Sequence, residues 1–381
     1  MGYFKLEADL DINKKPIIHL IVGARPNYIK ANPVYKKLAK QNWCDLVLIN
    51  TGQHYDHNMS KLFFDELKMK SPDINLEVGS DSHAIQTGKI MVRYEKVLME
   101  TSPNLVIVFG DVNSTIACSI AAVKLHIPTA HVESGLRSFD RSMPEEINRI
   151  LTDQISELLF ITSQEAEKNL NNEGISSENI YFVGNTMIDS LIEFMDHFSK
   201  SKIQEELKLK QPYMLMTFHR PSNVDNNENL KNLLQALEKV SETLDCVFPI
   251  HPRTHNRLNK NGLLNRLKNN PRFHILGPIG YIDFMRLQKD ASIILTDSGG
   301  IQEESTYFGV PCLTVRKNTE RPVTITHGTN KLIGEKYLNI PKEIEKAISG
   351  DVINKPSPKL WDGKASDRIS EIINHYFGTE H

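Results

Sequence analysis

Long apolar runs, paired cysteines and an excess of charge of either sign are all missing from this sequence. No stretch approaches the roughly 20 apolar residues that a membrane-spanning helix needs, and segment 1–16 is too charged and mixed for a secretory signal. The formal net charge is −2 with acidic and basic residues interspersed, which argues against a nucleic-acid partner. We therefore expect a cytoplasmic chain that binds neither nucleic acid nor membrane.

Metal-ligand spacings are also missing. The four cysteines form no CxxC pair, and most adjoin apolar runs, which favours reduced thiols packed in a core over disulfides or zinc. There is no HExxH motif, and the one close histidine pair, His54 and His57, lies in a polar segment without other ligands nearby. We interpret these two as loop histidines and expect no metal.

Short apolar runs alternate with longer segments of helical periodicity along the whole chain. This alternation is typical of βα units around a parallel sheet, so the expected fold class is α/β. The strands predicted in the first half are Ile17–Val22, Leu46–Asn50, Leu105–Phe109, Thr129–Val132, Leu158–Thr162 and Ile180–Val183. Those predicted in the second half are Tyr213–Phe218, Cys246–Ile250, His274–Leu276, Ser292–Leu295 and Cys312–Val315.

At 381 residues the chain is long enough for two domains with separate cores. After a predicted helix from Met187 to about Phe198, the polar segment 199–212 ends in proline, as an exposed connector would. We predict two doubly wound halves with a ligand cleft between them, because ligands bind at the carboxyl ends of parallel strands.

The segment TDSGGIQEE follows a predicted strand and opens a helix. Gly299 and Gly300 would let the backbone approach a ligand, and the first N–H groups of the helix, with the Ser298 hydroxyl, would point at an anion. Glu303 and Glu304 suit a ribose diol, because one carboxylate accepts hydrogen bonds from two hydroxyls. A capped helix with solvated glutamates is the competing interpretation. The segment alone therefore divides evenly between a diphosphate site and a structural helix start.

The segment IVGARPNYIK repeats this architecture near the start of the chain. Gly23 lies in the turn, Pro26 at a favoured first helical position, and Arg25 and Lys30 beside the helix N-terminus. Positive charge and helix dipole would together suit a phosphate. The alternative is a set of surface charges on an amphipathic helix.

Three acidic residues mark the densest signal, between positions 106 and 149. Asp111 follows a strand and a glycine, Glu133 follows the apolar run TAHV, and Glu145 follows a proline at a helix start. Carboxylates at strand ends in this fold face the ligand crevice. Asp111 could instead be an N-cap and Glu145 a first-turn acid. Glu133 is the strongest catalytic candidate, because a charge after a buried strand must be solvated or paired.

Cationic pairs follow two strands of the second half. His219 and Arg220 end one strand, and His251 and Arg253 end the next. A strand-end histidine is more often structural than catalytic, but two such pairs on one rim indicate anion binding. Arg321, beyond the strand that follows TDSGG, could complete a diphosphate clamp.

The motifs GARPNYIK, TGQHYD, GDVNST, HVESGLRS, MPEEINR, GNTMIDSL, FHRP, HPRT, TDSGGIQEE and NTERP occur in this order between about Ile17 and Gly334. In order and spacing they closely resemble the non-hydrolysing UDP-N-acetylglucosamine 2-epimerases. The resemblance implies a glycosyltransferase-B type fold of two Rossmann-like domains that face a central cleft. The N-terminal domain would comprise residues 1–186 and a C-terminal helix at about 366–381. The C-terminal, UDP-binding domain would comprise residues 187–365.

The resemblance also implies what the chain does. Members of this family interconvert UDP-N-acetylglucosamine and UDP-N-acetylmannosamine for surface polysaccharides, usually as homodimers, without a dissociable redox cofactor. The catalytic residues implied by motif are Asp111, Glu133, Glu145 and His219. The implied substrate and UDP contacts are Arg25, Lys30, His251, Phe284, Ser298, Gly299, Gly300, Glu304 and Arg321.

Some positions depart from the family pattern. The regulatory second-substrate site of the family uses two glutamines near TGQH, and here Gln53 is present whereas the second position is Asp56. Asn27-Tyr28 and Ser134 are spellings that also occur in relatives acting on UDP-diacetamido uronic acids. The alternatives are therefore such an epimerase, a hydrolysing 2-epimerase that releases UDP, a glycosyltransferase of similar fold, and a non-catalytic nucleotide-sugar-binding module.

Overall fold

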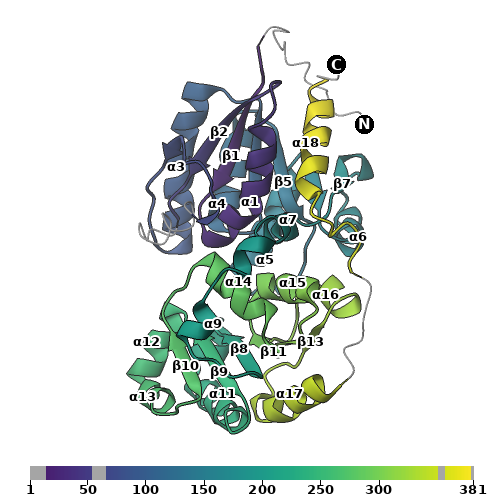
Figure 1. Cartoon of the computed structure of the whole chain (residues 1–381). Helices are drawn as coiled ribbons and strands as arrows, with labels where there is room; N and C mark the ends of the chain where they lie inside the picture. Colours follow the sequence, from purple (N-terminus) through teal and green to yellow (C-terminus); the bar gives the residue numbers. More distant parts are fainter. Residues whose placement is uncertain (1–13, 54–65, 351–356, 379–381) are drawn as a thin grey trace. The chain divides into compact units, whose positions relative to one another are not determined.

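The computed structural model describes residues 14–53, 66–350 and 357–378, which form two compact units, each built around its own parallel sheet (Figure 1). The first unit comprises Met1–Gly135, Asp140–Thr186 and Lys364–His381, and the second comprises Leu136–Phe139 and Met187–Gly363. The expected α/β class with two Rossmann-like sheets is confirmed. His54, Asp56 and His57 lie outside the described residues.

Seven parallel strands form the sheet of the first unit, in the order β3-β2-β1-β4-β5-β6-β7. The order reverses between β1 and β4, and such a switch point is where doubly wound sheets bind ligands. The strands are β1 Ile17–Val22, β2 Asp45–Asn50, β3 Ile74–Asn75, β4 Leu105–Phe109, β5 Thr129–Ser134, β6 Leu158–Ile161 and β7 Ile180–Phe182. The helices are α1 Arg25–Leu38, α3 His83–Thr101, α4 Asn113–Lys124, α5 Pro144–Ile155, α6 Gln164–Asn172, η1 Ser177–Asn179 and α18 Ala365–Tyr376.

The central strands of this sheet read as continuous apolar runs because helices cover both faces. All five residues of β4, sequence LVIVF, are buried, and β1 is nearly so. One face packs on α3 and α4 through residues such as Ile90, Tyr94 and Ala117. The buried strands fix where their carboxyl ends, and the polar residues that follow them, come together.

The last helix, α18, belongs to the first unit and packs on α1 (Figure 1). Lys37 of α1 forms an ion pair with Asp367. Arg368 donates a hydrogen bond from Nη1 to the Val183 carbonyl at 2.9 Å. The chain therefore returns to the unit in which it began.

Six parallel strands form the sheet of the second unit, in the order β10-β9-β8-β11-β12-β13, with the switch point between β8 and β11. The strands are β8 Tyr213–Thr217, β9 Asp245–Pro249, β10 Phe273–Leu276, β11 Ile293–Thr296, β12 Cys312–Thr314 and β13 Asn330–Leu332. The helices are α7 Thr186–Glu193, α8 Met195–Phe198, α9 Ile203–Glu206, α10 Pro221–Val224, α11 Asn227–Val240, α12 Pro252–Lys260, α13 Leu264–Lys268, α14 Tyr281–Lys289, α15 Gly299–Phe308, α16 Val323–Thr326, η2 Tyr337–Asn339 and α17 Ile340–Ser349.

The eleven predicted strands all form, with ends that differ by at most two residues, whereas β3 and β13 were not predicted. The predicted connector at 199–212 is exposed over most of its length, but it has one buried face. This segment contains α9, and Ile203 lies 8% exposed in a core cluster with Tyr213 and Leu287. Its apolar side chains are separated by charged residues, so composition hides the one face that is buried.

All four cysteines are buried free thiols, as the sequence predicted. Burial raises the pKa of Cys246 to about 12 and those of Cys44 and Cys312 to about 11, so these thiols are not reactive at neutral pH. Among the described residues no helix is long and apolar enough to cross a membrane.

Candidate active site

Glu133 occupies an irregular position near the end of β5. The pairing of β5 with β6 shifts register between Val132 and Ser134, so Glu133 is the extra residue of a bulge. Its φ is +73°, in the left-handed region that non-glycine residues rarely adopt. Strain of this kind persists only where the surroundings impose it, and it concentrates at functional sites. The sequence predicted that the strand ends at Val132. In the structure β5 continues to Ser134, with the bulge at Glu133.

Glu133 and Lys30 form a buried ion pair. Each side chain is 6% exposed, and the Lys30 ammonium contacts Glu133 Oε2. Lys30 is therefore not one of the solvated surface charges that the sequence left open. Gly110 makes room for the pair, because a Cβ added there would lie 3.0 Å from Lys30 Nζ and 3.1 Å from Glu133 Oε2.

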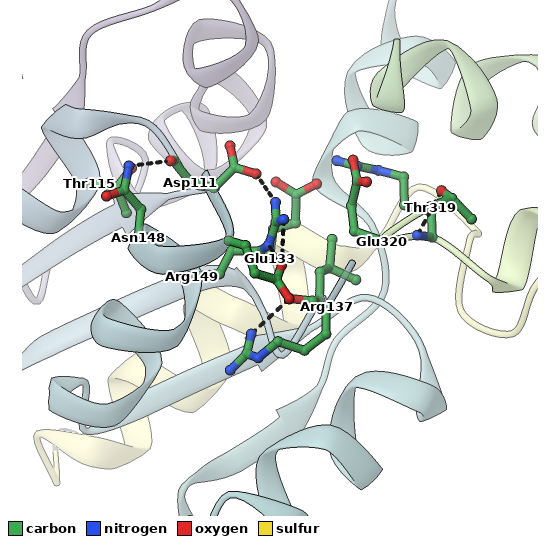
Figure 2. Close-up of polar contacts among 12 residues, drawn as sticks. Asp111, Thr115, Glu133, Arg137, Asn148, Arg149, Thr319 and Glu320 are labelled. Atoms are coloured by element: carbon green, nitrogen blue, oxygen red, sulfur yellow. Dashed lines mark hydrogen bonds and ion pairs between the residues drawn. The ribbon is translucent and has the colours of Figure 1, made fainter. Parts of the chain in front are cut away.

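Asp111, at the end of β4, is held by Arg149 of α5 (Figure 2). Arg149 is 2% exposed and also donates to Glu146 Oε2, from Nε at 3.0 Å and from Nη2 at 2.6 Å. Asn148 Nδ2 donates to the Asp111 carbonyl at 2.9 Å. Asp111 is not the N-cap of α4, which is Val112. The Asp111 carboxylate is thus fixed in place while 27% of its side chain stays exposed.

Glu145 is the second residue of α5 and is partly exposed. Its side chain makes no hydrogen bond or ion pair with any residue in the described ranges, whereas its neighbour Glu146 is buried against Arg149. Glu146 and Arg149 were not among the site residues predicted from the sequence. Their three-residue separation on one helix face, at a spacing that favours ion pairs, was the available signal.

In the second unit, His219 follows β8 and is oriented by Asp297, which follows β11. The His219 Nδ1 and Asp297 Oδ1 atoms are 2.9 Å apart. Asp297 is fully buried and also accepts hydrogen bonds from the backbone N–H of Arg220 at 2.9 Å and from Asn223 Nδ2 at 3.0 Å. Asp297 was not predicted as a site residue, although it lies within TDSGG.

These contacts determine the charge of Asp297. Burial by itself raises the pKa of this carboxyl, but the charge of His219 and the hydrogen bonds from His219, Asn223 and the Arg220 backbone outweigh it. The pKa therefore lies below its ordinary value of 3.8, and the carboxylate stays ionised. The ionised carboxylate favours a proton on His219 Nδ1, which leaves Nε2 for other contacts.

His251 and Arg253 lie beside His219 in the second unit. The rings of His219 and His251 are 5.5 Å apart, and His251 caps α12 by accepting the Arg253 N–H at 3.1 Å. The Arg253 guanidinium forms an ion pair with Asp225 at 2.6 Å. Arg253 is thus already paired with a carboxylate, whereas the two histidine rings lie next to each other.

The glycine turn opens α15 as the sequence predicted, with Ser298 at the N-cap position. The Ser298 side chain makes no capping hydrogen bond. A Cβ on Gly299 would lie 2.5 Å from Arg321 Nη1 and 2.6 Å from Glu320 Oε1, so in this structure the glycine admits the Arg321 guanidinium. Gly300 packs against Met187, where an added Cβ would lie 3.2 Å from the methyl group.

Arg321 is not a free cation in this structure. Its side chain is 6% exposed, and it pairs with Glu303 through Nε at 2.9 Å and with Glu320 through Nη1. Arg316 contributes a second cation to the same cluster by pairing with Glu320 at 2.7 Å. Glu304 is buried too and accepts a hydrogen bond from Gln288 at 2.7 Å. Glu303 and Glu304 are therefore both buried and are not the solvated glutamates of the competing interpretation.

The remaining candidates have varied surroundings. Arg25 begins α1 and is half-buried, and Phe284 of α14 packs partly against a core cluster. Gln53 is buried, and its side-chain oxygen accepts from the Ser114 N–H at 2.9 Å and the Ser114 hydroxyl at 2.6 Å. No group of three His, Cys, Asp or Glu side chains in the described ranges is arranged to hold a metal.

Comparison with known proteins places this geometry in a family. The family model for UDP-N-acetylglucosamine 2-epimerase matches residues 36–374. The chain belongs to the UDP-N-acetylglucosamine 2-epimerase family. A curated relative of that name from Methanococcus maripaludis is 44% identical over 369 residues, which cover 95% of this chain and 98% of the relative.

Two further relatives in this family bear on the substrate. The crystal structure of the Methanocaldococcus jannaschii UDP-GlcNAc 2-epimerase in complex with UDP-GlcNAc and UDP matches with a TM-score of 0.89 and 42% identity, and covers 94% of this chain and 99% of that one. A UDP-2,3-diacetamido-2,3-dideoxy-D-glucuronate 2-epimerase from Pseudomonas aeruginosa is 38% identical, over 93% of this chain and 98% of that protein.

Proposed function

We propose that the protein is a non-hydrolysing UDP-N-acetylglucosamine 2-epimerase, which interconverts UDP-N-acetylglucosamine and UDP-N-acetylmannosamine. The observation that carries the proposal is the pair of fixed carboxylates at the ends of adjacent strands, Asp111 and the strained Glu133. Relatives named for this activity are 44% and 42% identical to the chain, which supports UDP-N-acetylglucosamine as the substrate.

The chemistry explains why such a site needs carboxylates. The C2 hydrogen of the sugar is not α to a carbonyl, so its direct removal would leave no stabilised carbanion. If the C1–O bond to UDP breaks first, positive charge develops at the ring and acidifies the C2 proton. Loss of that proton forms the C1–C2 double bond of a 2-acetamidoglucal. UDP then adds back to C1 while a proton reaches C2 from the opposite face.

Within this scheme we assign roles by residue environment. Asp111, Glu133 and Glu145 share the acid and base roles on the two faces of the sugar, and His219, oriented by Asp297, assists the departure of UDP. Glu133 pairs with Lys30 and Asp111 with Arg149, so each carboxylate is held in a defined position for proton transfer.

We assign UDP binding mainly to the second unit. Ser298, Gly299 and Gly300 present the N-terminus of α15 to the diphosphate, and Glu304 accepts the ribose hydroxyls. Arg321, which is paired with Glu303 and Glu320 in this structure, is the cation proposed for the diphosphate. The other proposed contacts are Arg25, Lys30, His251 and Phe284.

Two of the three residues that pointed to a uronic acid substrate, Asn27 and Tyr28, have structural explanations. Asn27 donates from Nδ2 to the Phe109 carbonyl at 2.7 Å, and its Oδ1 accepts the Ala24 N–H. The Tyr28 hydroxyl donates to Asn50 at 3.0 Å. Because both side chains are committed to the first unit's own scaffold, they give no specific support to a charged sugar.

Incubation with UDP-N-acetylglucosamine in deuterated water tests the proposal, followed by mass spectrometry and NMR. We expect deuterium at C2 with UDP still attached, and the same mixture when the reaction starts from UDP-N-acetylmannosamine. Stoichiometric free UDP with N-acetylmannosamine would instead identify a hydrolysing enzyme. Exchange only with UDP-2,3-diacetamido-2,3-dideoxy-glucuronate would overturn the assigned substrate.

We further propose that the protein works as a homodimer in the cytoplasm and supplies precursors of surface polysaccharide. On α3, Ile85, Val92 and Met99 are 50%, 59% and 69% exposed and follow one another at seven-residue intervals. A seven-residue spacing keeps side chains on one helix face, so they form an exposed apolar stripe that a second copy could cover. Four free cysteines favour a reducing compartment.

A further inference from the structure

His131 and Asp153 form a buried pair that the proposed catalytic roles do not use. His131 lies in β5 and Asp153 near the end of α5, and both side chains are 0% exposed. The His131 Nδ1 and Asp153 Oδ1 atoms are 2.6 Å apart. Polar groups buried this deeply are retained where their remaining atoms are also bonded.

The remaining atoms of the pair bond to two backbone turns. His131 Nε2 lies 2.8 Å from the Gly110 carbonyl, and it must donate there because a carbonyl only accepts. Asp153 Oδ2 accepts the Gly135 N–H at 3.0 Å. The pair thereby joins Gly110, which directly precedes Asp111, to Gly135, which follows Glu133 by two residues.

The turns held in this way have unusual backbone conformations. Gly110, Glu133 and Gly135 have φ values of +63°, +73° and +75°. A Cβ on Gly135 would lie 2.7 Å from the Ala166 carbonyl oxygen, so the chain passes close to α6 at this point. The left-handed conformation of Glu133 is unfavourable by itself and has to be imposed by its neighbours. The hydrogen bonds at Gly110 and Gly135 hold the two turns that lie next to this residue.

We infer that His131 and Asp153 are positioning residues for the epimerisation, which set the separation of the turns carrying Asp111 and Glu133. This inference rests on the proposed function. Neither side chain contacts a sugar in this role. The pair acts through the backbone, and it fixes the two carboxylates within the small tolerance that proton transfer allows.

His19 provides a matched control for the loss of a buried histidine. It lies in β1 of the same sheet and is also 0% exposed. Its Nδ1 is 3.0 Å from the Tyr94 hydroxyl and its Nε2 is 3.2 Å from the Thr101 hydroxyl. These contacts join a strand to a helix, away from Gly110 and Gly135. Replacement of His19 therefore reports the cost to folding alone.

Two replacements of His131 separate the two halves of the pair. The side-chain nitrogen of His131→Asn corresponds to Nδ1 and keeps the bond to Asp153, whereas that of His131→Gln corresponds to Nε2 and keeps the bond to Gly110. We expect kcat of His131→Asn to fall about 10- to 100-fold with UDP affinity unchanged, because misplacement of about 1 Å has that effect on catalysis. His131→Gln should recover part of this loss.

The controls make the test decisive. His19→Asn should lower Tm while its kcat stays at the wild-type value, and amide exchange at Gly135 should be faster in Asp153→Asn than in the wild type. Wild-type kcat in folded His131→Asn, or an equal loss in His19→Asn, would overturn the inference while leaving the proposed function intact. A wild-type enzyme without C2 exchange would reject the proposed function itself.

Discussion

At the scale of single residues, Glu133 combines burial, a charged partner and a strained backbone. Replacing it by Gln keeps its size but leaves the Lys30 ammonium buried without an opposite charge. We expect C2 deuterium exchange to fall by about 10²- to 10⁴-fold, the usual contribution of a general acid or base. UDP affinity, measured by calorimetry, should largely persist because the diphosphate and ribose contacts are assigned mainly to the second unit.

Stability must be separated from catalysis in that variant, because removing one partner of a buried pair costs about 3–5 kcal/mol. The double variant Lys30→Met with Glu133→Gln removes both charges and should recover much of the lost free energy of unfolding. Its C2 deuterium exchange should stay as low as that of Glu133→Gln. If Glu133→Gln turned over at the wild-type rate, Glu133 would have no catalytic role.

The sequence located this residue but could not describe its geometry. The apolar run TAHV predicts a buried strand, and a charge at its end predicts a site. The left-handed φ of Glu133 depends on how β5 pairs with β6, which is a contact between segments distant in sequence. The ion pairs of Arg321 were hidden from the sequence for a similar reason. Its positive charge is evident from sequence, whereas its two carboxylate partners emerge only from the packing of α15 against the loop after β12.

At the scale of secondary-structure elements, predictability follows burial. Strands such as β1 and β4 are covered on both faces, so their sequences are unbroken apolar runs and their ends were predicted closely. The two-residue β3 and the polar β13, sequence NKL, have no such pattern and were missed. Their pairing depends on the neighbouring strand more than on their own residues.

Asp297 connects elements of the second unit, and this connection gives a pH prediction. It lies after β11 and holds the turn between β8 and α10 through four donors, the His219 and Arg220 backbones, Asn223 and the His219 ring. Its pKa is lower in the folded protein than its ordinary value, because these contacts outweigh the opposing effect of burial. The stabilisation is therefore present above about pH 4 and is lost as pH falls through the folded-state pKa.

Asp297→Asn should remove this pH dependence. It should also lower the free energy of unfolding at neutral pH by about 1–3 kcal/mol, because the Asn NH₂ group would face buried hydrogen-bond donors that it cannot accept from. Urea denaturation at several pH values from about 3 to about 7 measures both effects. Asp225, whose carboxylate pairs with Arg253 and Arg257 on the surface, supplies the control. Asp225→Asn should change stability by at most about 1 kcal/mol. Parallel acid-unfolding curves for wild type and Asp297→Asn would contradict the prediction.

At the scale of the whole molecule, the apolar stripe on α3 predicts the oligomeric state. The stripe lies opposite the helix face that buries Ile90 and Tyr94, so the unit's own core does not need it. Three large apolar side chains on one exposed face favour association with an identical face about a two-fold axis. Charge at the centre of that face should prevent association, because a desolvated lysine would oppose its own copy across the axis.

We expect light scattering to show that the wild-type protein is a dimer and that the Val92→Lys variant is a monomer. The Tm of the variant should equal that of the wild type. Leu338→Lys is the matched control, since Leu338 is 64% exposed in the second unit and lies outside the stripe. Its mass should stay that of the wild type. A monomeric wild type, or a Val92→Lys protein that remains dimeric, would remove α3 as the interface. The stripe would then be a solvent-facing surface with no role in assembly.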